Sequence, residues 1–100
     1  MEEEFYAILK LVSGEEIFSK VHPCDEDDRI LLILDSPIVM ELINIKQLGI
    51  TSIKVSPWIK FSEDEMFIMD LDKVITITET TDKDLINIHK KYIKIGRAHV

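Results

Sequence analysis

The chain has 100 residues, of which 46% are hydrophobic and 31% charged, a composition typical of one globular domain. The net charge of −7 argues against a broad phosphate-binding surface, although it leaves room for a small local site. The single cysteine, Cys24, excludes an intrachain disulfide, and the acidic start Met-Glu-Glu-Glu is unlike a signal peptide. The longest apolar run, Ile30 to Leu34, is too short to span a membrane. We therefore expect a cytoplasmic protein.

The chain opens with a predicted β-hairpin. Side chains along Phe5–Val12 and again along Glu16–His22 alternate between two faces, which is the period-two pattern of strands. Between them, Gly14 can take a positive φ at no steric cost, which favours a tight turn. Because each strand carries polar residues on at least one face, we expect antiparallel pairing with one face toward water.

A loop and a long strand are predicted next. Residues Pro23–Asp28 are assigned to a loop, because their four consecutive carboxylates repel one another and stay hydrated. The apolar run that follows, Arg29–Asp35, predicts a central strand. Asp35-Ser36-Pro37 interrupts this strand, and since proline lacks the N–H that a ladder needs, we expect a bulge or sharp bend before the chain resumes at Ile38.

The second half begins with three further predicted strands, at Ile50–Phe61, Met66–Asp70 and Val74–Thr78. Pro57 is expected at an edge or a kink of the first of them.

A helix is predicted from about Asp82 to Lys94, because Leu85, Ile88, His89 and Tyr92 recur at helical spacing. Thr81 and Asp84 have the spacing of a capping box at its start. Residues 95–100 fit the helix poorly and match the translation of a common sequencing-adapter DNA. We interpret 1–94 as a single domain and 95–100 as an artefactual tail, with a short disordered tail as the alternative.

The order of these elements resembles the Sm-like fold, a strongly bent, five-stranded open barrel. Ile8–Glu16 resembles the family's first strand and turn, Asp25–Leu34 its first sequence motif, and Met66–Thr78 its second. Asp35-Ser-Pro, Val55-Ser-Pro-Trp and the tyrosine-containing last helix are similar to short Sm-like proteins encoded by tailed phages. The resemblance implies a mainly β domain with a C-terminal α-helix, where Sm-like rings often have a helix at the N-terminus.

The resemblance also implies RNA as a partner, but the residues depart from the family pattern. Sm proteins that hold uridine-rich RNA in a central pore use an Asn in the first motif and an Arg-Gly pair in the second. Here Arg29 stands in place of that Asn, and Asp70-Leu71 in place of Arg-Gly. Carboxylates at such a rim replace attraction to phosphate with repulsion. The candidate RNA-binding residues are Arg29, Lys73 and Trp58.

Two interpretations are open for the role of Trp58, and two for the role of the lysines in the predicted helix. Trp58, next to Pro57, is suited to stack a base, and equally to fill a core or an interface. Lys90, Lys91 and Lys94 form the only basic cluster of the sequence. They either contact phosphate or complement the dipole at the C-terminal end of the helix.

A homo-oligomeric ring is expected on physical grounds as well. The strand Val74–Thr78 has no proline or charge to blunt its free edge, and such an edge recruits another strand. In Sm-like proteins the penultimate strand of one subunit pairs with the final strand of the next, and this head-to-tail contact closes into a ring or continues as a filament. The predicted interface consists of Met66, Ile68, Val74, Ile75, Thr76, Ile77 and Thr78.

No pattern indicates an enzyme, a cofactor or a metal site. No serine lies in a nucleophile elbow, and Gly14 and Gly49 stand alone rather than in a phosphate-binding loop. His22, Cys24 and Asp25 lack the second ligand pair of a zinc site, and Asp25–Asp28 lacks the glycine and terminal glutamate of a calcium loop.

Two functions follow. The first is an Sm-like ring that associates with RNA without catalysis. The alternative is a protein-interaction or structural assembly module that binds no nucleic acid. Both functions are compatible with the same fold, so the fold alone does not distinguish them.

Overall fold

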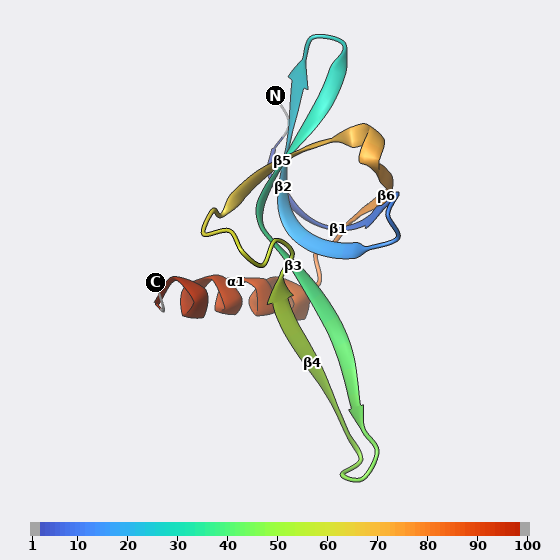
Figure 1. Cartoon of the computed structure of the whole chain (residues 1–100), viewed down its shortest axis with the longest axis vertical. Helices are drawn as coiled ribbons and strands as arrows, with labels where there is room; N and C mark the ends of the chain where they lie inside the picture. Colours follow the sequence, from blue (N-terminus) through green and yellow to red (C-terminus); the bar gives the residue numbers. More distant parts are fainter. Residues whose placement is uncertain (1–2, 99–100) are drawn as a thin grey trace.

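A computed structural model describes residues 3–98, without the side chains of Ile50 and of residues 95–98. Within this part the chain forms antiparallel strands and one C-terminal helix (Figure 1). The elements are β1 (Phe5–Leu11), β2 (Glu16–Glu26), β3 (Arg29–Ile45), β4 (Ile50–Pro57), β5 (Met66–Asp70), the short 3-10 helix η1 (Leu71–Lys73), β6 (Val74–Glu79) and α1 (Lys83–Ala98). The prediction of a mainly β, bent and open sheet followed by a helix is confirmed.

The strands lie in the order β4-β3-β2-β1-β6, and β5 also pairs with β3. β5 lies along Leu31–Asp35 of β3, and β4 along Ile38–Ile45. Because Ile38 pairs with both β2 and β4, these two strands lie on opposite edges of β3. β4 and β5 are therefore one interrupted strand on a single edge of β3, so the six strands correspond to the five of the Sm-like barrel that the resemblance implied. Pairing across the described residues leaves β5 and β6 apart, so the barrel is open.

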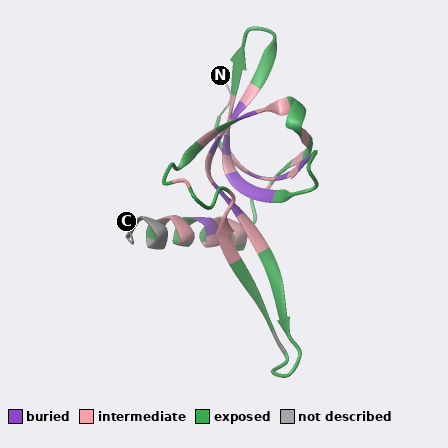
Figure 2. Ribbon diagram, viewed as in Figure 1, coloured by how far each residue is buried: buried purple, intermediate pink, exposed green. Residues whose placement is uncertain are grey.

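The core lies inside the bent sheet. Alternate residues of β1 and β2 point inward, so that Ala7, Leu9 and Val21 are fully buried, and β3 adds Leu32 and Leu34. Figure 2 shows that the buried residues follow the curved part of the strands, whereas the outer part of the β3–β4 ribbon is exposed. This ribbon projects away from the barrel (Figure 1).

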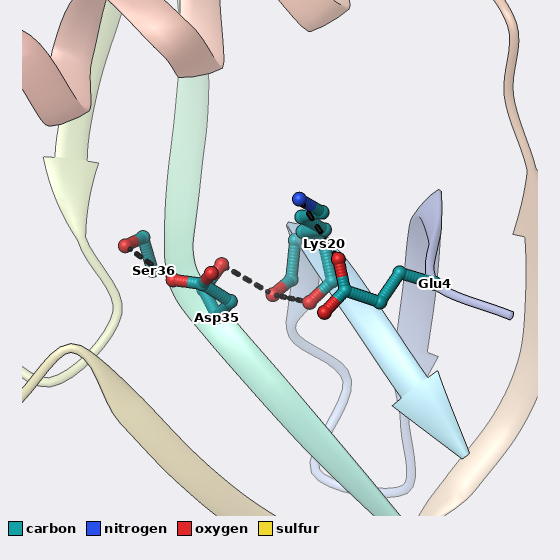
Figure 3. A network of polar contacts seen from close by, with 5 residues as sticks. Glu4, Lys20, Asp35 and Ser36 are labelled. Carbon is teal, nitrogen blue, oxygen red and sulfur yellow. Dashed lines mark hydrogen bonds and ion pairs between the residues drawn. The ribbon is translucent and has the colours of Figure 1, made fainter.

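The predicted break in β3 is confirmed as a bulge. Phe18 of β2 lies opposite Ile38, but Lys20 lies opposite Asp35, so the register shifts there. Ser36 has a φ of 53°, a conformation that a residue other than glycine seldom adopts. Ser19 Oγ lies 2.9 Å from the carbonyl of Lys20 and 3.2 Å from that of Asp35, which ties β2 to the bulge (Figure 3).

The helix α1 packs on the face of the sheet opposite the barrel core. His89 is fully buried there, and its ring lies edge-on against Tyr6 and Phe18, with centroids 5.3 and 5.6 Å away. Its Nε2–H donates to the carbonyl of Ser36 at 2.9 Å, while Nδ1 is buried without a partner. One histidine thus joins the helix to the bulge of β3.

The helix boundaries differ from the prediction. Oδ1 of Asp82 accepts from the N–H of Asp84 at 2.9 Å and of Leu85 at 3.4 Å, so the cap is Asp82 rather than Thr81. α1 continues to Ala98, past the predicted end at Lys94. Residues 95–98, which the prediction assigned to a tail, are therefore helical, and residues 99–100 lie outside the described part.

Two strand boundaries also differ. Pro23–Glu26 is not a loop but the end of β2, paired with Arg29–Leu32 around a turn in which Asp27 has a φ of 54°. Pro23 is tolerated because β2 is paired on one side only beyond Val21, where β1 begins. β4 ends at Pro57, and the predicted strand residues Trp58–Phe61 form a bend instead.

The docking of α1 is expected to weaken in mild acid. Burial lowers the pKa of His89 below its ordinary value of 6.5, and the carbonyls of Ser36 and Asp35 offset this only in part. The unfolded chain therefore binds a proton before the folded chain does, and the free energy of unfolding falls as the pH drops below that value. We expect His89→Gln to reduce the difference in urea-unfolding free energy between about pH 7.5 and about pH 5.5.

The matched control for this measurement is Asn87→Gln, an exposed and non-titrating position of the same helix. This variant should keep the dependence of the wild type on pH. An unchanged dependence in His89→Gln would contradict the role given to this histidine.

Candidate functional site

The turn between β2 and β3 and the helix η1 form an open pocket of about 580 Å³. It is lined by Asp28, Arg29, Ile30, Asp70, Leu71 and Asp72. Arg29 and Asp70-Leu71 are the positions that the sequence places at the two family motifs. The fold brings them together although about 40 residues separate them in the chain.

The polar groups of this pocket are mostly acidic. Nη1 of Arg29 lies 3.6 Å from Oδ2 of Asp70, and the two side chains are 62% and 27% exposed. Oδ1 of Asp70 accepts from the N–H of Asp72 at 3.0 Å and so caps η1. Three aspartates therefore line the pocket with one arginine, whose guanidinium is already paired with Asp70. The pocket suits a phosphate poorly and a cationic or neutral group better.

The other two predicted RNA-binding residues are placed differently. Lys73 ends η1, and its carbonyl accepts from the N–H of Val12 at 2.9 Å in the β1–β2 turn. Trp58 is half-buried against the barrel core, donates from Nε1 to Glu15 at 3.2 Å and lies edge-on to Phe67 at 6.3 Å. Trp58 is thus tied to the β1–β2 turn and does not line the pocket. RNA contacts by these residues stay a prediction.

The predicted interface residues lie on the two open edges of the barrel. Met66 and Ile68 of β5 are 57% and 72% exposed, and Ile75 of β6 is 64% exposed. Thr76 and Thr78 are also exposed. In contrast, Val74 and Ile77 are half-buried and pack against the core of their own subunit. Met66, Ile68 and Ile75 are therefore the apolar residues of this set that a neighbouring subunit could contact.

Other kinds of site find no support within the described residues 3–98. No group of three or more His, Cys, Asp or Glu side chains there lies close enough together to hold a metal ion. No described helix has the length and apolar character to cross a membrane. Cys24 is an exposed free thiol at the end of β2.

Sequence reasoning missed two acidic residues of the pocket and one lysine of the helix. Asp28 and Asp72 each lie next to a motif position in the sequence, and this adjacency could have identified them as pocket residues. Lys83 was left out of the basic cluster, although it is the first residue of α1. Its distance from Lys90 in the sequence hides that they share a helix face.

Comparison with known families agrees with this geometry. The family model described as Sm_like domain matches residues 8–90, a span that includes every strand after the first residues of β1 and the first half of α1. No curated protein matches the chain significantly.

Asp70 offers a test of which contact holds the pocket together. We expect Asp70→Ala to lower the free energy of unfolding by about 1 kcal/mol, because η1 loses its cap. Asp70→Asn keeps an acceptor for Asp72, and Arg29→Gln removes only an exposed ion pair, so each should cost less than about 1 kcal/mol. Urea unfolding of the three variants measures this. If Arg29→Gln costs as much as Asp70→Ala, the ion pair rather than the cap is the stabilising contact.

Proposed function

Because this chain belongs to the Sm-like family, we propose that it is a non-catalytic, ring-forming module that associates with RNA. The observation that carries the proposal is the family match, which spans both motif regions and the open barrel between them. Association with RNA is common in this family, and rings are its usual assembly.

The open edges support assembly into a ring. β5 pairs with β3 on one side and β6 with β1 on one side, which leaves a row of backbone groups on each strand for another chain. Exposed Ile68 and Ile75 lie on these two strands and would be covered by strand pairing between neighbours. A contact between two different edges is head-to-tail and rotates each subunit relative to the one before it. The subunits form a closed ring when a whole number of these rotations adds up to 360°.

The acidic pocket supports a second candidate function. Asp28, Asp70 and Asp72 line the pocket together with Arg29, and Arg29 and Asp70 stand at the motif positions with which Sm rings hold uridine-rich RNA. Together with the net charge of −7, this favours a protein-interaction or structural assembly module that uses the ring without nucleic acid.

We also place the chain with the short Sm-like proteins that tailed phages encode, acting in the cytoplasm. The support is the bulge sequence Asp35-Ser-Pro, the Val55-Ser-Pro-Trp stretch and the last helix with its tyrosine. The exposed free thiol of Cys24 suits a reducing compartment.

Light scattering at micromolar concentration tests the ring. We expect the wild type to have a mass that is a multiple of 11.6 kDa. Ile68→Glu places a charge on the edge of β5 and should give a monomer of 11.6 kDa. The matched control is Leu42→Glu, because Leu42 is 76% exposed but lies on the projecting ribbon.

The control variant should keep the mass of the wild type. A monomeric wild type would contradict the ring, and loss of assembly in both variants would contradict the assignment of the interface to β5.

Filter binding with uridine-rich and adenine-rich RNA at low salt tests the second half of the proposal. We expect retention of at least one of the two, and we expect freshly purified protein to carry nucleic acid visible in its absorbance ratio. Absence of both would exclude RNA association. A pull-down whose partners survive nuclease treatment would then support the assembly module.

A further inference from the structure

The outward face of α1 carries a line of lysines. At 100° per residue, Lys83, Lys90 and Lys94 lie within about 40° of one another around the helix axis. The opposite side contains His89, which is buried against the sheet. Lys83, Lys90, Lys91 and Lys94 are all exposed. We call these four residues the lysine face.

None of these lysines forms an ion pair with another residue among those that the structure describes. In the described part, the ion pairs are Lys20 with Glu4 and Arg29 with Asp70, and neither involves α1. The lysine face is therefore free to bind an external anion. It extends over roughly 16 Å of helix, enough for several positions along an extended chain.

The charge of the molecule is divided between two regions. Residues 83–94 contain four of the 12 basic residues and one of the 19 acidic residues, so this segment carries +3. The remainder of the chain carries −10, since the whole carries −7. A polyanion that approaches this molecule is repelled by most of its surface and attracted by one helix.

The helix dipole does not account for this arrangement. A dipole favours cations in the last turn of a helix and disfavours them in the first. Lys83 is the first residue of α1, and the helix continues to Ala98 beyond Lys90 and Lys94. The lysines thus follow a face of the helix rather than its C-terminal end.

We propose that the lysine face of α1, rather than the pocket at Arg29 and Asp70, is the surface that contacts RNA phosphates. This inference rests on the proposed association with RNA and names the site for it. A membrane surface fits less well, because the apolar side of α1 that would enter a lipid layer is occupied by Tyr6 and Phe18 of the sheet. In a ring, every subunit presents the same face, so weak contacts add.

Two triple variants with equal charge test the proposal. Lys83→Gln/Lys90→Gln/Lys94→Gln removes three charges from the lysine face and keeps helix propensity, since Lys and Gln are similar in this respect. Lys46→Gln/Lys54→Gln/Lys60→Gln removes three exposed charges from the β3–β4 ribbon and the following bend. Arg29→Gln probes the pocket. Circular dichroism and light scattering verify that each variant keeps its helix and its assembly.

The measurement is filter binding of uridine-rich and adenine-rich single-stranded RNA over a range of salt concentrations. We expect the lysine-face variant to bind roughly tenfold or more weakly and to lose about 2 from the slope of log K against log salt. The ribbon variant and Arg29→Gln should stay within about twofold of the wild type.

The outcomes separate the two claims. If the wild type binds RNA and the lysine-face variant binds equally well, the inference is wrong while the association stands. Equal losses in both triple variants, or a loss only in Arg29→Gln, also overturn it. If the wild type binds neither RNA, the proposed association fails, and the inference fails with it.

Discussion

The bulge at Asp35-Ser36-Pro37 in β3 is the constraint on which the rest of the structure depends. Backbone groups that the bulge leaves without a ladder partner form hydrogen bonds elsewhere. The N–H of Ser36 donates to the backbone carbonyl of Glu65 at 2.7 Å, and the carbonyl of Pro37 accepts from the backbone N–H of Trp58 at 3.0 Å. The carbonyl of Ser36 accepts from His89, and that of Asp35 lies within reach of Ser19. One irregularity thus joins β2, the interrupted β4–β5 edge and α1.

This arrangement determines what the surface can present. The bend leaves β5 beside the first half of β3 and β4 beside the second, so that the edge of β5 remains open next to the barrel. The same bend holds α1 by its apolar side and turns its lysines outward. The proposed assembly and the proposed anion binding therefore use different elements, and neither uses the acidic pocket at η1.

Local patterns predicted those features that depend on neighbouring residues. The alternation of β1 and β2, the break at Pro37 and the helical spacing of Leu85 and His89 are all confirmed. The strand end at Pro23–Glu26 was missed, because its carboxylates suggest a hydrated loop and only the pairing with β3 shows otherwise.

The candidate site was less predictable, because its members are distant in sequence. The proximity of Arg29 to Asp70 followed from the family resemblance and not from any local pattern. The contact of Trp58 with Glu15 depends on the bend after β4, which no periodicity signals. Lys83 lay inside the predicted helix but was not grouped with the other lysines, because it lies seven positions before Lys90 in the sequence.

The most direct test of the central claim is hydrogen–deuterium exchange at the amides of β5 and β6 that point away from β3 and β1. In a ring these amides bond to the neighbouring subunit, so we predict that they exchange slowly at high protein concentration and rapidly after dilution to the monomer. Rapid exchange at every concentration, while the amides between β1 and β2 stay protected, would contradict assembly through the open edges.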